Sequence, residues 1–349
     1  MKQIKLANGR IIGDGAPIYT IAEIGINHNG DFELAKQMVE VAAKTGVDAV
    51  KFQKRTVEEM YTKNFLDEAY NKHYAFGATY GDHKRFLEFK DEQFFELQQL
   101  AYSLNIDFIV SGFDATSFEF IENKLNVHIH KIASPFVTHY PLLKQVAGYG
   151  KPVILSTGMH TFDEIKDAVK YIRQFNDQIV LFQATTLYPC PDDMVNLNVL
   201  KTFREELDVL VGYSSHDKGV ILPAASVALG ACMIEKHFTL DRTMIGPDHA
   251  ASVEPRGLEM IVKYAKSVSV GLGDKSKNAQ KSEEDARIKY GVSIVTAKAL
   301  IKGDKIKEDD ITVKCPGGGI SPVQFWDIIG KQVNKDIPVD EIIYAGDVN

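Results

Sequence analysis

The feature of this sequence that most constrains its fold is an alternation of short β-branched runs with longer amphipathic segments. Eight runs have the length and composition of buried strands, and they lie at residues 19–25, 49–53, 107–113, 128–134, 152–157, 179–186, 207–215 and 232–238. Segments of helical period lie at residues 32–46, 91–105, 161–176, 219–230 and 256–273. We therefore expect each strand to be followed by a helix.

Strands that are this apolar and are joined by helices are typical of a parallel sheet with both faces buried. Eight such units within about 250 residues match the size and strand count of a closed barrel. The sequence therefore predicts an α/β fold, a (β/α)8 TIM barrel. An open doubly wound sheet is the alternative architecture.

Helix-boundary signals support this division. Asp31 stands directly before the first helical segment, and Thr161 with Glu164 has the Ser/Thr-x-x-Glu spacing of a capping box. Gly46 and Gly150 stand where glycines commonly end helices.

The composition changes after Gly273, where the polar and charged segment DKSKNAQKSEEDARIKYG begins. This change marks a domain boundary. Short strand-like runs follow from Val292 onward, separated by glycine-containing turns. We place the barrel domain at residues 1–275, a linker at 276–290 and a small β-rich domain at 291–349. A unit of about 60 residues folds alone only marginally, so we expect it to pack against a barrel, its own or a partner's.

Composition favours soluble metabolism in the cytoplasm. A net charge of −7 and a pI near 5.8 give no electrostatic reason to expect nucleic acid or an anionic membrane as a partner. No apolar run is long enough to span a bilayer, and no signal peptide is recognisable. The three cysteines form no CxxC pair, which argues against a disulfide framework or a thiolate zinc site: they are Cys190, Cys232 and Cys315.

Polar residues gather where the predicted strands end, which is where barrel enzymes carry their catalytic groups. For any single residue, a hydrogen-bonded core group is the simpler interpretation, but eight coincident strand ends favour a site. Lysines, hydroxyls and imidazoles at one mouth indicate an anionic, phosphorylated substrate beside a metal. The candidates are Glu23, Lys51, Gln53, Ser111, Lys131, Ser134, Ser156, Thr185, Thr186, Tyr188, Ser214, His216, Glu235 and His237.

His216 and His237 end consecutive strands, so their imidazoles can share one divalent ion and leave positions free for water or substrate. Hydrogen-bonded core histidines are the alternative. His28 and His249 better fit hydrogen-bonding roles in loops. Lys51 and Lys131 fit as charged anion-binding groups, with a Schiff-base lysine as the other option.

Several long strings resemble sialic acid synthases and related nonulosonic acid synthases in order and spacing: IAEIGINHNG, VKFQK, HKIAS, YPLLK, GKPVILSTGM, VGYSSHD, ALGACMIEKHFTLD and GPDHAAS. The segment KCPGGGISP resembles the loop of the antifreeze-like (SAF) domain of that family. The resemblance covers essentially the whole chain. It implies condensation of phosphoenolpyruvate with N-acetylmannosamine or a related 2-acetamido sugar aldehyde, giving phosphate and a nine-carbon 3-deoxy-2-keto acid.

The resemblance also implies residue roles, a cofactor and an assembly. A divalent ion, Mn²⁺ or else Mg²⁺ or Co²⁺, and a homodimer in which the small domain caps the partner's barrel belong to this expectation. Glu23 and Glu235 match carboxylates that manage the attacking water. His216 and His237 match metal ligands. The phosphoenolpyruvate contacts would be Lys51, Ser111, Lys131, Ser134, Ser156, Thr186 and Ser214, and the acceptor contacts Gln53, Tyr188 and Asp248.

The sequence departs from the family pattern at three places. Pro135 and Phe136 stand where an acidic acceptor contact usually follows the HKIAS string, and Cys315 stands where an arginine usually does. These changes predict a different acceptor, of the legionaminate or pseudaminate kind, unless Lys314 replaces the missing cation. Ser215 replaces an aspartate that usually precedes the metal histidine.

Two rival functions remain open at this point. Another phosphoenolpyruvate-dependent barrel synthase, making a seven- or eight-carbon acid from a phosphorylated aldose, would leave the small domain unexplained. A non-catalytic sugar-binding relative would have no need for the lysines, carboxylates and imidazoles together.

Overall fold

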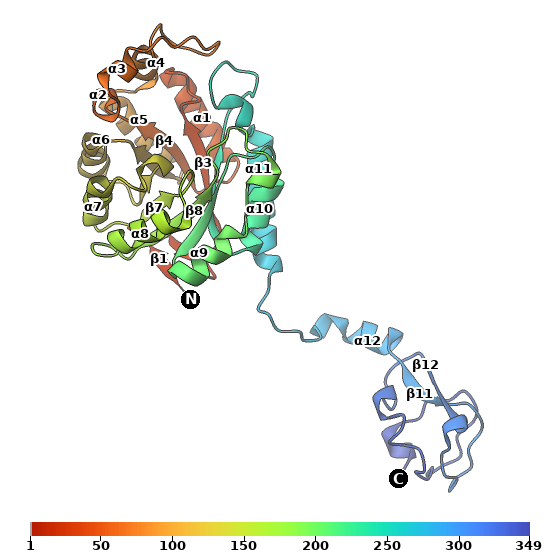
Figure 1. The fold of residues 1–349 in the computed structure, drawn as a ribbon. Helices are drawn as coiled ribbons and strands as arrows, with labels where there is room; N and C mark the ends of the chain where they lie inside the picture. Colours follow the sequence, from red (N-terminus) through yellow and green to blue (C-terminus); the bar gives the residue numbers. More distant parts are fainter. Residues whose placement is uncertain (1) are drawn as a thin grey trace. The chain divides into compact units, whose positions relative to one another are not determined.

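A computed structural model describes residues 2–349 of the chain, which divide into two compact units. The first unit ends at Gly273, and the second runs from Asp274 to Asn349. Figure 1 shows the elements of both units.

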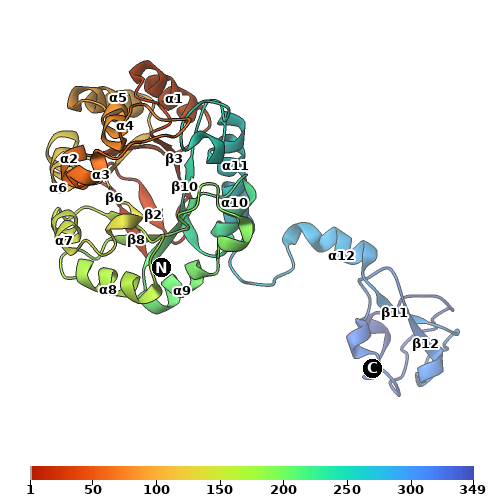
Figure 2. The same ribbon diagram turned by 45° about the horizontal axis from the view of Figure 1, so that its top comes forward.

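The first unit is a closed barrel of eight parallel strands, as predicted. Its strands neighbour one another in the order β10-β3-β4-β5-β6-β7-β8-β9, which excludes an open doubly wound sheet. Figure 2 shows the helices arranged around this ring. The strands are β3 (Tyr19–Gly25), β4 (Ala49–Lys54), β5 (Asp107–Gly112), β6 (His130–Ile132), β7 (Val153–Ser156), β8 (Ile179–Ala184), β9 (Leu210–Ser215) and β10 (Ala231–His237).

Helices follow the strands, and their ends agree with the boundary signals. Asp31 accepts hydrogen bonds from the amides at the start of α1, and Thr161 with Glu164 forms the predicted capping box at α8. Gly46 and Gly150 have positive φ values of 85° and 75°. The barrel helices are α1 (Phe32–Lys44), α5 (Asp91–Ser103), α6 (Ala115–Phe120), α7 (Tyr140–Gly148), α8 (Phe162–Ile172), α9 (Val199–Leu207), α10 (Ile221–Ala228) and α11 (Pro255–Gly271).

Two predicted strand boundaries were wrong. The seventh strand begins at Leu210 and not at Leu207, because helix α9 extends to Leu207 and Asp208 then turns the chain with a left-handed φ of 50°. The fourth strand is only His130–Ile132, and Ser134–Phe136 forms a 3-10 helix instead of extending it. Apolar sequence alone does not separate the end of a buried helix from the start of a buried strand.

An N-terminal hairpin that the sequence analysis missed fills the amino-terminal end of the barrel. Strands β1 (Gln3–Lys5) and β2 (Ile11–Gly13) pair antiparallel, and Ile4, Leu6 and Ile12 are buried against inward-facing barrel residues such as Tyr19. Each strand is three residues long, too short for a periodicity argument.

A long excursion between β4 and β5 lies at the opposite end of the barrel (Figure 1). It contains α2 (Val57–Met60), α3 (Lys63–Leu66) and α4 (Tyr80–Leu87). Aromatic contacts hold it together, including Tyr61 against Phe65 and Tyr80. This excursion contributes side chains to the site described below.

The second unit begins with an exposed helix, α12 (Glu284–Tyr290), and continues as a small β-rich domain. Strands β11 (Ser293–Thr296) and β12 (Ile311–Lys314) pair antiparallel, and isolated bridges join the other segments. Its core is almost entirely isoleucine, valine and leucine: Ile294, Leu300, Ile306, Ile311, Ile320, Ile328, Val333, Ile337 and Ile343. Within residues 2–349, no helix has the length and apolar character needed to cross a membrane.

Candidate active site

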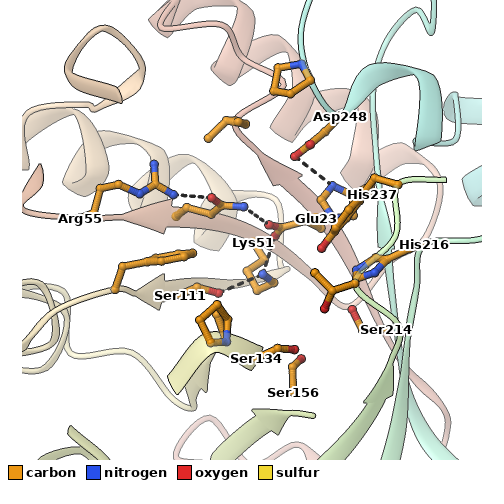
Figure 3. A pocket seen from close by; sticks show the side chains of 18 of the residues that line it. Glu23, Lys51, Arg55, Ser111, Ser134, Ser156, Ser214, His216, His237 and Asp248 are labelled. Atoms are coloured by element: carbon orange, nitrogen blue, oxygen red, sulfur yellow. Dashed lines mark hydrogen bonds and ion pairs between the residues drawn. The ribbon is translucent and has the colours of Figure 1, made fainter. Parts of the chain in front are cut away.

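A cavity of about 300 Å³ lies among the carboxyl-terminal ends of the barrel strands. All of the predicted strand-end candidates except Thr185 line it, as does Asp248, although the individual roles of these residues stay predictions. These side chains are Glu23, Lys51, Gln53, Ser111, Lys131, Ser134, Ser156, Thr186, Tyr188, Ser214, His216, Glu235, His237 and Asp248. Figure 3 shows many of them converging on the cavity.

Strand register explains why residues so distant in sequence converge. Lys51 lies opposite Glu23 on the neighbouring strand, and Ser111 lies opposite Lys131. Ser214 likewise lies opposite Glu235. Because residues in register on parallel strands occupy one layer of a barrel, these side chains meet inside it.

Two lysines and two glutamates form a buried ionic cluster on the cavity floor. The Lys51 Nζ atom lies 2.7 Å from Glu23 Oε2 and 3.6 Å from Glu235 Oε1. Lys131 Nζ donates to Glu235 Oε2 at 2.7 Å. All four side chains are at most 5% exposed. When all four groups are ionised their charges cancel, so the cluster as a whole carries no net charge.

Burial and neighbouring charges shift the pKa values of the two carboxyl groups apart, and also those of the two lysines. Burial raises the pKa of Glu23 although Lys51 opposes the change. For Glu235, burial is outweighed by Lys131 and Lys51, so its pKa falls well below the usual range. Burial lowers the pKa of Lys131 to about 8, whereas Glu23 and Glu235 outweigh burial and raise the pKa of Lys51. Carboxylates with separated pKa values can divide acid and base roles.

Hydroxyl groups surround the ionic cluster. Ser111 Oγ accepts a hydrogen bond from Lys51 Nζ at 3.0 Å, and Ser134 Oγ accepts one from the Gly158 amide at 3.0 Å. Both arrangements leave the serine hydroxyl hydrogen free to donate to an anion. Gly158 is required for this packing, because a Cβ atom there would lie 2.4 Å from Thr186 Oγ1.

The two predicted metal ligands lie beside one another, with ring centroids 5.5 Å apart. His216 Nδ1 contacts the Thr185 carbonyl oxygen at 2.6 Å, so the neutral ring donates there and keeps Nε2 unprotonated. The buried Nδ1 of His237 has no hydrogen-bond partner in the described part of the chain and lies 3.7 Å from Asp248 Oδ2. The Tyr188 ring lies over the His216 ring, with 4.1 Å between the ring centroids.

These imidazoles fit a divalent metal. Burial, together with the neighbouring His237, lowers the pKa of His216 to about 3, and burial also lowers that of His237. Both rings are therefore neutral at physiological pH, as metal ligation requires. Within residues 2–349, no group of three His, Cys, Asp or Glu side chains is placed so that it could hold a metal ion, so water or substrate would supply the other ligands.

Ser215, which stands where the family usually has an aspartate, does not hydrogen-bond to His216. Its hydroxyl donates to Asp217 Oδ1, which also accepts from the Tyr213 hydroxyl at 2.6 Å. Lys236 Nζ donates to Ser215 Oγ at 2.9 Å. This buried network fixes the two chain segments that carry the imidazoles, while Thr185 orients His216 itself.

The cavity also contains residues that the sequence analysis missed. They come mostly from the excursion after β4, and the signal for it was the unusual distance between the second and third strands. Long loops at this end of a TIM barrel commonly carry function. The missed residues are Ile26, Arg55, Tyr61, Tyr70, Tyr80, His83, Lys84, Phe113, Ala133 and Pro247.

The residues that suggested an altered acceptor behave differently from one another. Pro135 lines the cavity, whereas Phe136 does not: it packs into the barrel core, edge to face with Phe113. Cys315 is an exposed residue of the second unit, and Lys314 beside it pairs with Asp340. Phe136 therefore gives no direct evidence about the acceptor.

His28 and His249, the two weaker candidates, do not line the cavity. His28 Nδ1 accepts from the Gly30 amide at 3.1 Å, and its ring stacks on Phe89. His249 Nδ1 bonds with Thr239 Oγ1 at 2.7 Å.

Known proteins with similar sequences span nearly the full chain. A Campylobacter jejuni N,N'-diacetyllegionaminic acid synthase is 38% identical, over 93% of this chain and 98% of its own. The human N-acetylneuraminate-9-phosphate synthase is 35% identical, over 98% of this chain and 95% of its own. The crystal structure of a Leptospira borgpetersenii N-acetylneuraminic acid synthetase is 32% identical, covers 82% of this chain and 95% of its own, and superposes with a TM-score of 0.73.

The matches to protein families follow the two structural units. Residues 38–277 match the NeuB family, and residues 291–349 match the SAF domain. A convergent site at the mouth of a closed barrel accompanies these matches. The chain therefore belongs to the NeuB family of nonulosonic acid synthases and carries a SAF domain at its C-terminal end.

Proposed function

We propose that this protein condenses phosphoenolpyruvate with a 2-acetamido sugar aldehyde, N-acetylmannosamine or a related hexose. The products are phosphate and a nine-carbon 3-deoxy-2-keto acid. The observation that carries the proposal is the buried cluster of Lys51, Lys131, Glu23 and Glu235 beside the imidazoles of His216 and His237. The names of the relatives include phosphorylated and unphosphorylated products, so they leave the exact acceptor open.

Phosphoenolpyruvate fits the floor of the cavity. Its carboxylate and phosphate match the ammonium groups of Lys51 and Lys131, which charge-assisted hydrogen bonds would hold. The hydroxyls of Ser111, Ser134 and Ser156 line the same region and would donate to the phosphate oxygens. Fixed donors of this kind stabilise the charge of the departing phosphate.

The ionic cluster on the floor has no net charge, so a divalent cation would balance the negative charge of bound phosphoenolpyruvate. The cation that we expect is Mn²⁺. His216 and His237 would hold it, and when bound it supplies Lewis-acid polarisation of the acceptor aldehyde. Asp248, 3.7 Å from His237, and Gln53 lie where they can orient the acceptor's hydroxyls. Tyr188 covers the same side of the cavity and would restrict access of water.

Glu23 and Glu235 would have different roles in the capture of water. After C3 of phosphoenolpyruvate attacks the aldehyde carbon, the positive charge at C2 is captured by water, and a base must take the water proton. Glu23 has the raised pKa that suits this base. Glu235 stays ionised, holds Lys131 in place and stabilises the charge that develops.

Release of phosphate from phosphoenolpyruvate tests the proposal. The assay contains Mn²⁺ and a panel of N-acetylmannosamine, diacetamido-trideoxy hexoses and phosphorylated aldoses, with His216→Ala beside the unchanged protein. Release that needs a 2-acetamido sugar and is lost in the variant supports the synthase. Release only with aldoses that lack an acetamido group favours the seven- or eight-carbon synthase. If the folded, metal-loaded protein releases no phosphate with any sugar of the panel, the result favours a non-catalytic sugar-binding relative.

Assembly and location follow from the same family expectation. We propose a cytoplasmic homodimer in which each SAF domain caps the partner's barrel. The mass of the full chain in solution, measured by light scattering, tests the dimer, and a monomeric mass at the concentration of the activity assay contradicts it.

A further inference from the structure

Lys236 is a buried lysine that the chemistry of the cavity floor does not use. It lies on β10 between Glu235 and His237, which both line the cavity, so its side chain points away from the barrel interior. The outward positions on either side of it, Ile234 and Phe238, belong to the apolar core between strands and helices. Lys236 is only 1% exposed there. Burying an ammonium group in such surroundings is costly unless it is hydrogen-bonded, so its partners matter.

The ammonium group of Lys236 holds both of the residues that flank His216. Its Nζ atom donates to the hydroxyl of Ser215 at 2.9 Å and to the backbone carbonyl of Asp217. The Ser215 hydroxyl donates in turn to the Asp217 carboxylate, so one hydroxyl joins the two opposite charges. Lys236 itself directly precedes His237 in the chain. One side chain of β10 therefore connects the backbone of one imidazole residue to that of the other.

This connection lies where the pairing of β9 with β10 ends. Ser215 is the last residue of β9, and Lys236 is its partner in the register of the two strands. His216 lies one residue beyond this pair. On its other side, the Cys190 amide, from the loop after β8, donates to the His216 carbonyl at 2.8 Å. Lys236 holds His216 from the opposite side, toward β10.

The separation of the two imidazoles depends on how these backbone segments are held. The ring centroids of His216 and His237 lie 5.5 Å apart. Imidazole ligands bind a divalent ion at about 2 Å, and a site whose supporting residues allow its ligands to shift by about 1 Å is already too loose. A contact that joins the two segments therefore affects the affinity of the site for an ion.

We propose that Lys236 is a positioning residue of the candidate metal site. Its ammonium group fixes the spacing of His216 and His237 by holding the two residues that flank His216. It acts through the imidazoles and contacts neither substrate nor ion. The inference rests on the proposed function in one respect, because the pair that it positions is the ion-binding pair of that proposal.

Two variants and a matched control test the positioning role. Lys236→Met keeps the length of the side chain and removes the donor, but it leaves the Asp217 carboxylate buried without its cation. Lys236→Met combined with Asp217→Asn removes both charges, so it keeps the test decisive if the single variant does not fold. Lys54→Met is the control, because Lys54 is an outward-facing lysine at the end of β4 that pairs with Asp91 and does not line the cavity.

Three measurements separate positioning from stability. Electron paramagnetic resonance of free Mn²⁺ gives the affinity of each protein for the ion, and the visible absorption of bound Co²⁺ reports the geometry of the ligands. Denaturant titration gives the free energy of unfolding. Crystal structures of the metal-free double variant and of the unchanged protein give the separation of the two imidazole rings without any ion.

Lys236→Met should weaken Mn²⁺ binding by about 10- to 100-fold, the range for residues that orient metal ligands, and should alter the Co²⁺ spectrum. Lys54→Met should change neither. The double variant should regain stability relative to Lys236→Met and still bind Mn²⁺ weakly. An affinity that returns together with stability in the double variant overturns the proposal, because Lys236 would then be only structural.

If the unchanged protein binds no Mn²⁺, the proposed cofactor fails, and the metal-free crystal structures then decide the positioning role. Rings of His216 and His237 that move apart or become disordered in the double variant support that role. Rings that keep the separation found in the unchanged protein overturn it.

Discussion

Lys131 and Glu235 lie 2.7 Å apart although their strands, β6 and β10, are opposite one another in the ring of the barrel. The pair thus spans the full interior just beneath the cavity. Both side chains are at most 5% exposed, so each charge depends on the other for its compensation. This contact ties the two halves of the barrel together at the level of the chemistry.

Breaking this pair from one side should destabilise the protein more than replacing both partners. Lys131→Met leaves Glu235 buried with only the more distant Lys51 for compensation, and we expect a loss of about 3–5 kcal/mol in the free energy of unfolding. The double variant Lys131→Met with Glu235→Gln should recover part of that loss. Denaturant titration of the single and double variants gives the coupling, and additive losses would contradict a mutually dependent pair.

The lowered pKa of Lys131 predicts a pH dependence for phosphoenolpyruvate. Burial moves the pKa of Lys131 to about 8, with Lys51 acting in the same direction and Glu23 and Glu235 opposing. The free enzyme therefore loses this ammonium above about pH 8, and kcat/KM for phosphoenolpyruvate should fall as pH rises through that value. Lys51, whose pKa is raised, stays charged over the same range.

This alkaline decrease is measured by determining kcat/KM for phosphoenolpyruvate over a pH series at saturating acceptor. Lys131→Gln has no group that titrates at this position, so its remaining activity should not decrease near pH 8. A decrease that persists unchanged in this variant would show that another group causes it.

Gly158→Ala should weaken phosphoenolpyruvate binding. The new Cβ atom would lie 2.4 Å from Thr186 Oγ1 and 3.1 Å from Ser134 Oγ, so both predicted phosphate contacts must move. We expect the KM for phosphoenolpyruvate to rise by about 10- to 100-fold, the effect of one charged hydrogen bond. Gly148→Ala is the matched control, because a Cβ atom there meets nothing within 4 Å. Equal KM values for the two variants would refute the predicted role of these hydroxyls.

The barrel and its site were accessible from sequence because both follow from a repeated local pattern. Each apolar run fixes a strand, and closing eight parallel strands brings all of their carboxyl ends to one mouth. The sequence could therefore place Lys51 and Glu235 in the same site before their contact was known. It could not predict that α9 ends at Leu207, because the helix and the following strand are equally apolar there.

The excursion after β4 shows where this reasoning stops. Lys84 reaches the cavity from helix α4, which aromatic contacts such as that between Tyr61 and Tyr80 hold in place, and no period in the sequence reports such packing. Phe136 shows the converse error: a residue that differs from a family pattern was read as a site residue, yet it packs in the core. Position in a motif does not determine the direction of a side chain.

Removal of His216 should weaken Mn²⁺ binding and not only activity. Its Nδ1 donates to the Thr185 carbonyl, which leaves Nε2 free for a metal, and the buried His237 Nδ1 has no hydrogen-bond partner among residues 2–349. Partners behind a metal ligand are themselves worth about 10- to 100-fold in affinity, so His216→Ala should weaken Mn²⁺ binding by at least about 100-fold. Electron paramagnetic resonance of free Mn²⁺ measures this directly, with the exposed His73→Ala as control. Unchanged Mn²⁺ affinity in His216→Ala would mean that these imidazoles are hydrogen-bonded core groups and that the charge of the floor is balanced in another way.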